Sequence, residues 1–185
     1  WQVAKRLSLE IPHLCWKNSP GYRADGNCRA CMVEIEGERV LAPSCRRTPT
    51  PDMRVTTDND RAETARKMVL ELLLTDQPKQ QEAHDPDSLL WHWADNFKLD
   101  GSRFPTRDAT PASDISHSAM SVNLDACIHC NLCVRACREV QVNDVIGMAH
   151  RGAESQIVFD MADPMGDSTC VACGECVQAC PTGAL

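Results

Sequence analysis

Aromatic side chains are scarce in this sequence, which holds four Trp, three Phe and one Tyr among its 185 residues. Aromatic residues supply much of the buried area of an ordinary core, so their scarcity argues against a large apolar core. A chain of this length can form one or two ordinary domains, or three small ones stabilised by bound groups. The composition therefore directs attention to residues that could bind such groups.

An excess of basic side chains is also missing, because 19 Lys and Arg stand against 26 Asp and Glu and leave a net charge of −7. A polyanion is held by a basic surface, so we expect no nucleic acid partner. No run approaches the roughly 18 apolar residues of a membrane-spanning helix, and Trp1 to Arg6 lack the apolar core of a signal peptide. We therefore expect a soluble, cytoplasmic chain. It does not begin with Met and it ends soon after Cys180-Pro181, which indicates a segment of a longer polypeptide.

Cysteine, by contrast, is abundant and clustered. The chain has 12 cysteines, a share below the roughly 8–10% that marks a short disulfide scaffold. In the run Cys127-Ile-His-Cys130-Asn-Leu-Cys133 the thiols are too near one another in sequence to suit disulfides, but they can converge on one metal centre. In a reducing compartment this clustering indicates metal binding.

The spacing C-x2-C-x2-C-x3-C occurs twice, from Cys127 to Cys137 and from Cys170 to Cys180, and Pro181 follows the second run. It is the pattern of two-cluster bacterial ferredoxins, in which the fourth cysteine of each run ligates the other cluster. Two zinc sites of four cysteines are the alternative, but zinc usually takes C-x2-C pairs rather than triplets. The pattern predicts two [4Fe-4S] clusters with these ligands: Cys127, Cys130, Cys133 and Cys180 for one, and Cys137, Cys170, Cys173 and Cys176 for the other.

The remaining cysteines are Cys15, Cys28, Cys31 and Cys45, with a single close pair. This spacing suits either a [2Fe-2S] cluster or a zinc ion, and spacing alone does not decide between them. Both kinds of iron–sulfur cluster carry one electron, so three clusters in one chain would conduct electrons. We predict no catalytic residue among the 185 residues of this sequence.

Several charged residues lie beside the predicted ligands. His129 stands between two of them, and we expect a surface or hydrogen-bonding role because the cysteines already complete both sites. Two interpretations are open for the arginines: they offset the negative charge of the clusters or guide docking, or they form an ordinary solvated face. The arginines are Arg46, Arg47, Arg135 and Arg138.

Local patterns predict an α+β chain. Apolar periodicity and turn residues indicate helices over residues 1–8, 61–75 and 88–97, with Asp60 as the N-cap of the second. Hairpins are predicted over residues 31–41, turning at Gly37 with Val40 and Leu41 in the returning strand, and over residues 144–159, turning near Gly152.

The order of these motifs resembles the N-terminal iron–sulfur region of NAD-linked formate dehydrogenase alpha subunits. The segments that carry the resemblance are IPHLCWKNSPGYRADGNCRACMVEI, CIHCNLCVRACREVQ and DPMGDSTCVACGECVQACPTGAL. Relatives with the same module include the large iron–sulfur subunit of NADH dehydrogenase, diaphorase-side subunits of NAD-reducing hydrogenases, and [FeFe] hydrogenases.

The resemblance implies three domains. Residues 1–58 would form a [2Fe-2S] domain of the β-grasp fold that lacks its N-terminal part, and residues 117–185 a ferredoxin-like domain with two [4Fe-4S] clusters. Residues 59–116 would form a helical segment and linker. Many relatives hold an extra [4Fe-4S] cluster there through H-x3-C-x2-C-x5-C, but this chain has His84 followed by Ser88, Trp91 and Phe97. Indole and phenyl rings cannot ligate iron, so we interpret the segment as a vestigial site converted to packing. The alternative is a new metal site from His84, His92 and Asp85 or Asp95.

The function implied is electron transfer within a formate dehydrogenase. In such enzymes a molybdenum or tungsten pterin in the C-terminal domain of the same polypeptide interconverts formate and carbon dioxide. A beta subunit with iron–sulfur clusters, FMN and NAD is the expected partner. The alternatives are a diaphorase-side subunit of an NAD-reducing hydrogenase, the large iron–sulfur subunit of NADH dehydrogenase, and a zinc-stabilised scaffold with no redox role.

Overall fold

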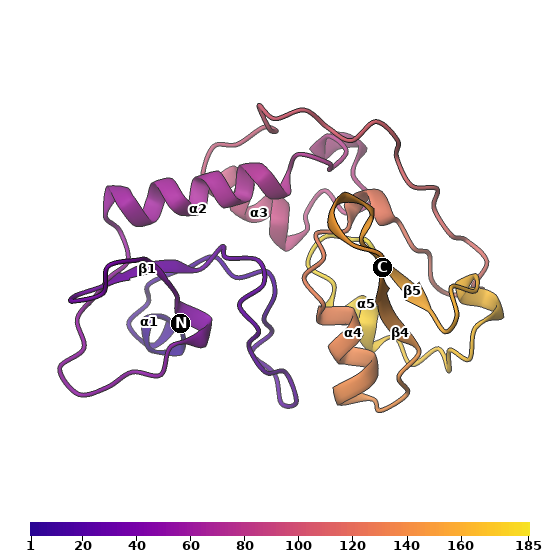
Figure 1. Cartoon of the computed structure of the whole chain (residues 1–185), viewed down its shortest axis with the longest axis horizontal. Helices are drawn as coiled ribbons and strands as arrows, with labels where there is room; N and C mark the ends of the chain where they lie inside the picture. Colours follow the sequence, from indigo (N-terminus) through magenta and orange to yellow (C-terminus); the bar gives the residue numbers. More distant parts are fainter.

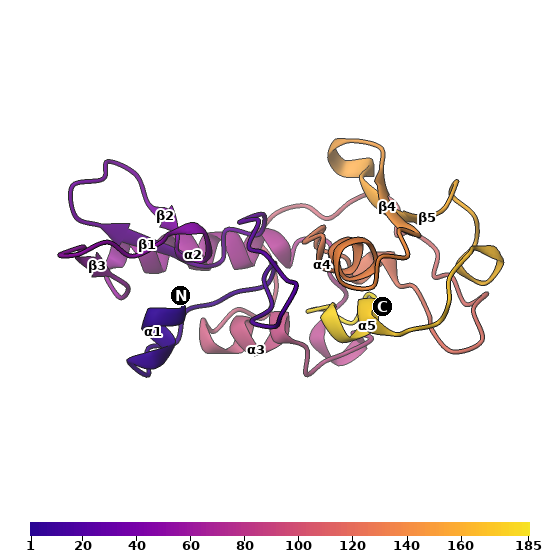
Figure 2. The same cartoon turned by 90° about the horizontal axis from the view of Figure 1, so that it is seen from below.

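The N-terminal part of the chain, in indigo, and the C-terminal part, in orange and yellow, lie side by side along the long axis of the molecule (Figure 1). The computed structural model describes residues 1–185. Two helices of the middle segment pass between the ends (Figure 2). The helices are α1 (Gln2–Arg6), α2 (Asp60–Leu73), α3 (Leu89–Asn96), α4 (Leu132–Arg135) and α5 (Glu175–Ala179), and the strands are β1 (Met32–Ile35), β2 (Ala42–Pro43), β3 (Val55–Thr56), β4 (Ile146–Ala149) and β5 (Gln156–Phe159).

The N-terminal sheet has the antiparallel order β2-β1-β3, with β1 in the centre. Along β1 the side chains alternate between the two faces, so Val33 and Ile35 are buried while Met32 and Glu34 are more exposed. The prediction that Val40 and Leu41 form the returning strand is wrong. Val33 pairs with Ala42, so the returning strand begins at Ala42 and not at Val40. Val40 lies in the connection between β1 and β2 and is 52% exposed.

The helix predicted over residues 61–75 is confirmed as α2, but its cap differs. The Asn59 side chain accepts a hydrogen bond of 2.9 Å from the Ala62 amide, so Asn59 is the N-cap. Asp60, the predicted cap, is instead the first helical residue, where the helix dipole favours a carboxylate.

The buried face of α2 includes a charged residue. It consists of Ala62, Arg66 and Leu70, whereas Leu72 is 52% exposed. Arg66 belongs to this face because its Nε donates to the Met32 carbonyl of β1 at 2.7 Å. A long polar side chain thus joins the helix to the N-terminal sheet.

The hairpin predicted over residues 144–159 is confirmed as β4 and β5, which pair from Ile146 with Phe159 to Ala149 with Gln156. Gly152 begins a short 3₁₀ turn between them. Helix α4 continues into a π-helical turn, Ala136–Val140, that contains Cys137. Such π turns are rare and are frequent at functional sites.

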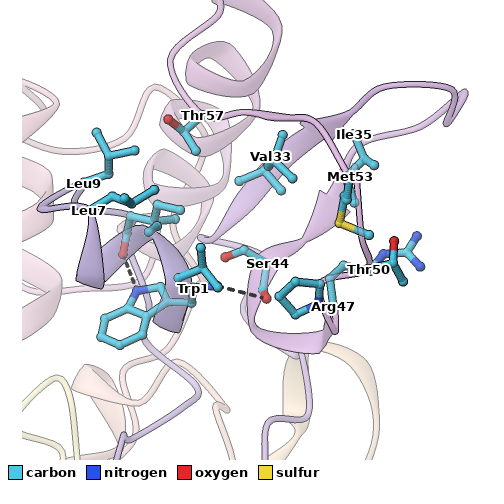
Figure 3. Close-up of a pocket in the computed structure, with 15 residues that line it drawn as sticks. Trp1, Leu7, Leu9, Val33, Ile35, Ser44, Arg47, Thr50, Met53 and Thr57 are labelled. Carbon is cyan, nitrogen blue, oxygen red and sulfur yellow. Dashed lines mark hydrogen bonds between the residues drawn. The ribbon is translucent and has the colours of Figure 1, made fainter.

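An apolar pocket lies at the N-terminal end, between α1 and the sheet (Figure 3). Trp1, Leu9, Val33 and Met53 are among its lining residues, and no cysteine is. The Trp1 indole donates to the Ile11 carbonyl at 2.8 Å. The pocket nevertheless adjoins the first cysteines, because Cys31 belongs to the same apolar cluster as Val33 and Cys45 packs against that cluster. No helix of the chain combines the length and the apolar character needed to cross a bilayer.

Candidate metal centres

Strand pairing brings together the first set of cysteines, Cys15, Cys28, Cys31 and Cys45. Cys31 directly precedes β1 and Cys45 follows β2, and the antiparallel pairing of Met32 with Pro43 places the two side by side. The backbone amide of Ser44 also donates to the Cys31 carbonyl at 3.0 Å. Three of these cysteines are buried and Cys45 is half-buried.

The four thiols of the first set are hydrogen-bonded to one another. Bonds from the Cys28 and Cys45 thiols lower the pKa of Cys15 to about 2. A bond from Cys45 lowers the pKa of Cys31 to about 6, while the pKa values of the donors Cys28 and Cys45 are raised. Backbone amides of Asn27 and Cys28 also donate to the Cys15 sulfur. Two of the four sulfurs, those of Cys15 and Cys31, are thus favoured as thiolates, the form that binds iron or zinc.

The loop before the Cys28–Cys31 pair requires glycine at Gly26. Its φ of +74° lies in the left-handed region, and a Cβ atom there would stand 2.9 Å from the Arg46 side chain. Gly21 has a φ of +85° and lies against Val140 of the C-terminal part. The two glycines therefore let the loop run close to its neighbours.

The second set lines one cavity at the C-terminal part: Cys127, Cys130, Cys133 and Cys180. It unites the three closely spaced cysteines of the first run with the last cysteine of the second run. Burial raises the pKa of Cys133, and the charges of Cys130, Cys127 and Cys180 raise it further. Buried thiols of this kind stay neutral unless a metal replaces their protons.

The third set lines a separate cavity: Cys137, Cys170, Cys173 and Cys176. Burial, and then the charges of Cys170, Cys173 and Cys137, raise the pKa of Cys176 to about 11. The Val145 amide approaches the Cys137 sulfur at 3.3 Å, and the Ala172 amide approaches the Cys170 sulfur at 3.4 Å. Amides directed at sulfur stabilise thiolates bound to a metal. Cys173 is the one exposed cysteine of the chain.

The two runs wind around their cavities in the same way. Each has a left-handed residue directly before and directly after its second cysteine: His129 and Asn131 in one run, Ala172 and Gly174 in the other. Three of these four are not glycine, and L-residues adopt this conformation at a cost. Strained backbone concentrates at functional sites, so the shared turn shape points to a shared binding role.

The sulfur arrangement bears on the choice between zinc and iron clusters. Zinc needs its ligands within about 2.3 Å of a single ion. No three side chains of His, Cys, Asp or Glu converge on a point where one metal ion could bind. The second and third sets instead each line a cavity of their own. Four sulfurs around a cavity suit a larger inorganic core that separates them.

The three sets adjoin one another in order. The charge of Cys15 of the first set contributes to the raised pKa of Cys130 in the second, after the larger effect of burial. The charge of Cys176 of the third set likewise contributes to the raised pKa of Cys133. The second set therefore adjoins each of the other two.

The arginines beside the cysteines differ in environment. Arg138 is exposed and pairs with Asp144, and Arg47 pairs with Glu38 at the surface. Arg46 is exposed and donates to the Ala24 carbonyl at 2.8 Å. Arg135, in contrast, is 2% exposed, so a solvated face is the wrong interpretation for this residue.

His129 and a residue that the sequence did not single out lie together. His129 is half-buried, and burial followed by the charge of Arg107 lowers its pKa. The Arg107 charge also acts on Cys127. Arg107 reaches this position because its amide and guanidinium bind Asp76, at 2.9 and 3.3 Å. No cysteine spacing could have identified it, since it lies in the linker.

The segment around His84 makes capping and packing contacts. Ser88 is the N-cap of α3 and accepts from the Trp91 amide at 3.5 Å, and Trp91 is 2% exposed. Phe97 ends the helix and is half-buried. The His84 Nε2 lies 3.1 Å from the Asp125 carboxylate. His92 contacts Asn96 and Asp95 contacts Gln80, so neither of the two residues contacts His84.

Comparison with known proteins assigns both ends of the chain. Residues 1–60 match the 2Fe-2S iron-sulfur cluster binding domain, and residues 126–184 match the 4Fe-4S dicluster domain. This chain is an iron–sulfur electron-transfer module. The module therefore contains a 2Fe-2S domain followed by a 4Fe-4S dicluster domain.

Relatives of the module are components of oxidoreductases. It is 37% identical over 189 residues to the NADP-reducing hydrogenase subunit HndD of Solidesulfovibrio fructosivorans, covering 99% of the module and 32% of that protein. It is 32% identical over 192 residues to the G 2 component of the NADH-quinone oxidoreductase of Rhizobium meliloti, covering 99% and 21%. A candidate formate dehydrogenase of Staphylococcus haemolyticus is 26% identical over 187 residues, covering 100% and 18%.

A solved structure shares the fold of the module. A chain in the crystal structure of NAD⁺-reducing [NiFe]-hydrogenase in the H₂-reduced state superposes with a TM-score of 0.87 at 26% identity. The match covers 98% of the module and 77% of that chain. The module spans about a third or less of the length of the curated relatives that it matches.

Proposed function

We propose that this module is the electron relay of a cytoplasmic NAD-linked formate dehydrogenase alpha subunit. The proposed domains are residues 1–58, residues 59–116 with the vestigial site, and residues 117–185. The proposed ligands are the three sets: the first for a [2Fe-2S] cluster, the second and third for one [4Fe-4S] cluster each. When bound, each cluster accepts and releases one electron.

The observation that carries the relay is the order of the cysteine sets. Cys15 lies within electrostatic reach of Cys130, and Cys133 within reach of Cys176. The chain therefore holds its three sets of cysteine ligands next to one another, with members of every set in the main apolar core. The row also supports a place for the first set on the main electron path, although the middle segment carries no cysteine.

The two ends of the row suit different neighbours. The exposed Cys173 lies at the third set, beside Val171, which is 63% exposed. We propose that the molybdenum or tungsten pterin domain of the same polypeptide lies beyond this set. A beta subunit with FMN and NAD would then exchange electrons at the first set.

Formate is the proposed substrate because residues 135–147 and 163–185 resemble formate dehydrogenase alpha subunits. The candidate formate dehydrogenase relative aligns with the whole chain. A hydrogenase subunit is the second candidate, favoured by the 37% identity to the HndD hydrogenase subunit and by the hydrogenase structure. Both candidates use the same relay and differ in the source of electrons.

The test is low-temperature EPR on the anaerobic parent complex, with formate, hydrogen and NADH added to separate samples. The proposal predicts reduced-cluster signals with formate and NADH and none with hydrogen. Acetate serves as the control, because it is a carboxylate like formate but has no hydrogen on its carboxyl carbon. Signals with hydrogen and silence with formate would replace the first candidate by the second. Silence with every donor, together with bound zinc, would refute both.

A further inference from the structure

Arg135 is a buried arginine between the first and second cysteine sets. Its Nη2 donates to the Cys15 carbonyl at 2.6 Å and approaches the Cys130 carbonyl at 3.4 Å. Its Nε donates to the Asn131 carbonyl at 3.2 Å, and its Nη1 donates to the Arg23 carbonyl. One guanidinium therefore binds the backbone of two loops that each hold a proposed ligand.

A second contact joins the same two loops. The Asn27 amide side chain, adjacent in sequence to Cys28, lies 3.5 Å from the Cys130 carbonyl. The Cys130 carbonyl therefore faces two donors, one from each side of the junction. A loss of the guanidinium would leave buried carbonyls without partners, which is costly in an apolar core.

The internal repeat offers a natural comparison. The first run reads Cys133-Val-Arg-Ala-Cys137 and the second reads Cys176-Val-Gln-Ala-Cys180, so Gln178 holds the position of Arg135. Gln178 is exposed, whereas Arg135 is buried. The N-terminal loop reaches the second run as well, where Lys17 donates to the Gln178 carbonyl at 3.2 Å, but no hydrogen bond joins the Gln178 side chain to that loop. The arginine side chain thus connects two sets, whereas the glutamine side chain does not.

The charge of Arg135 is fixed and only partly balanced. A guanidinium does not lose its proton in proteins. Asp25 lies 3.3 Å away but also pairs with Arg23, at 2.7 Å. Charges interact more strongly in an apolar interior than in water. A cation here favours the reduced, more negative state of a neighbouring redox group.

We propose that Arg135 is a positioning residue that holds the first set against the second. Its charge also raises the reduction potential of the [4Fe-4S] group bound by the second set. This inference rests on the proposed relay, but not on formate as the electron source. The step concerned is the transfer of one electron, supplied by NADH through the flavin-bearing partner or by dithionite in the test. The donor loses that electron and the acceptor gains it, and no bond is made or broken.

The test uses the anaerobic parent complex with Arg135→Gln, which copies the second run, and Arg135→Lys, which keeps the charge. One readout is microwave power saturation of the [2Fe-2S] EPR signal, which relaxes faster when a reduced neighbour is close. The other is the midpoint potential from a redox titration. We expect Arg135→Gln to cause a severalfold loss of relaxation enhancement and a negative shift in the potential of the first [4Fe-4S] group. Arg135→Lys should restore the potential more fully than the relaxation enhancement. Lysine keeps the positive charge but lacks the planar guanidinium that bonds both loops.

Arg138→Gln is the matched control, since Arg138 is three residues away, exposed and bonded to Asp144. If Arg135→Gln does not bind its clusters, Asp25→Asn carries the test. It removes the counter-charge, and we expect a positive shift in potential, opposite in sign to that of Arg135→Gln. Wild-type relaxation enhancement and midpoint potential in Arg135→Gln would overturn the proposal. An unshifted midpoint potential in Asp25→Asn would overturn it as well. A wild-type complex without any cluster signal would instead refute the relay itself.

Discussion

Single residues in the left-handed region shape the turns around the cysteines. His129, Asn131, Ala172 and Gly174 occupy equivalent places in the two runs. These backbone angles let a short loop direct several side chains and amides toward one cavity. The three non-glycine residues show that the turns persist despite a conformational cost of about 1–2 kcal/mol each.

Gly174→Ala tests this cost without steric interference. No atom lies within 4 Å of the position that its Cβ would take, and its φ is +74°. We expect a loss of about 1 kcal/mol in unfolding free energy from the backbone alone. Thermal unfolding of the cluster-loaded protein measures it. Gly101→Ala is the control, because Gly101 also has open space but no positive φ. Equal effects of the two substitutions would contradict the account.

At the scale of elements, α3 packs against the loop that holds Cys180 of the second cysteine set. The Leu90 amide donates to the Pro181 carbonyl at 3.1 Å, next to Cys180. A Cβ atom at Gly183 would stand 2.6 Å from the Asp85 side chain, so the C-terminal loop and the start of α3 are in close contact. Trp91 fills the core beneath them.

Substitutions in α3 should change stability and not metal content. Trp91→Ala should cost about 3–5 kcal/mol of unfolding free energy because it removes a buried indole. His84→Ala should cost far less, since His84 is partly exposed and bonds only Asp125. Iron content per folded chain should equal the wild-type value in both variants. A loss of about four iron atoms in His84→Ala would show that a fourth cluster exists there.

Parts of the fold and of the site were predictable because they depend on local sequence. Cysteine spacing defines each triplet, and apolar periodicity indicated α2 and the β4–β5 hairpin. The N-cap was misplaced by one residue, because Asn59 and Asp60 are both good caps and only the chain entry angle separates them. The burial of Arg135 was not predictable, since its partner Cys15 is 120 residues away.

At the scale of the whole molecule, side-chain contacts hold the N-terminal and C-terminal parts of the chain together. The Tyr22 hydroxyl donates to Glu175 of α5 at 2.7 Å, and burial followed by this bond raises the pKa of Tyr22. Arg23 pairs with Glu139 at 3.0 Å. These contacts link the loop of the first set to the helical turns that contain Cys137 and Cys176 of the third set. The row of sets is therefore a property of the complete chain.

Iron analysis of the anaerobically purified chain tests the three-set account most directly. One [2Fe-2S] and two [4Fe-4S] clusters predict about ten iron atoms per chain and no stoichiometric zinc. About fourteen iron atoms would contradict the vestigial assignment of the His84 segment. Two or three zinc atoms with no iron would contradict the electron relay as a whole.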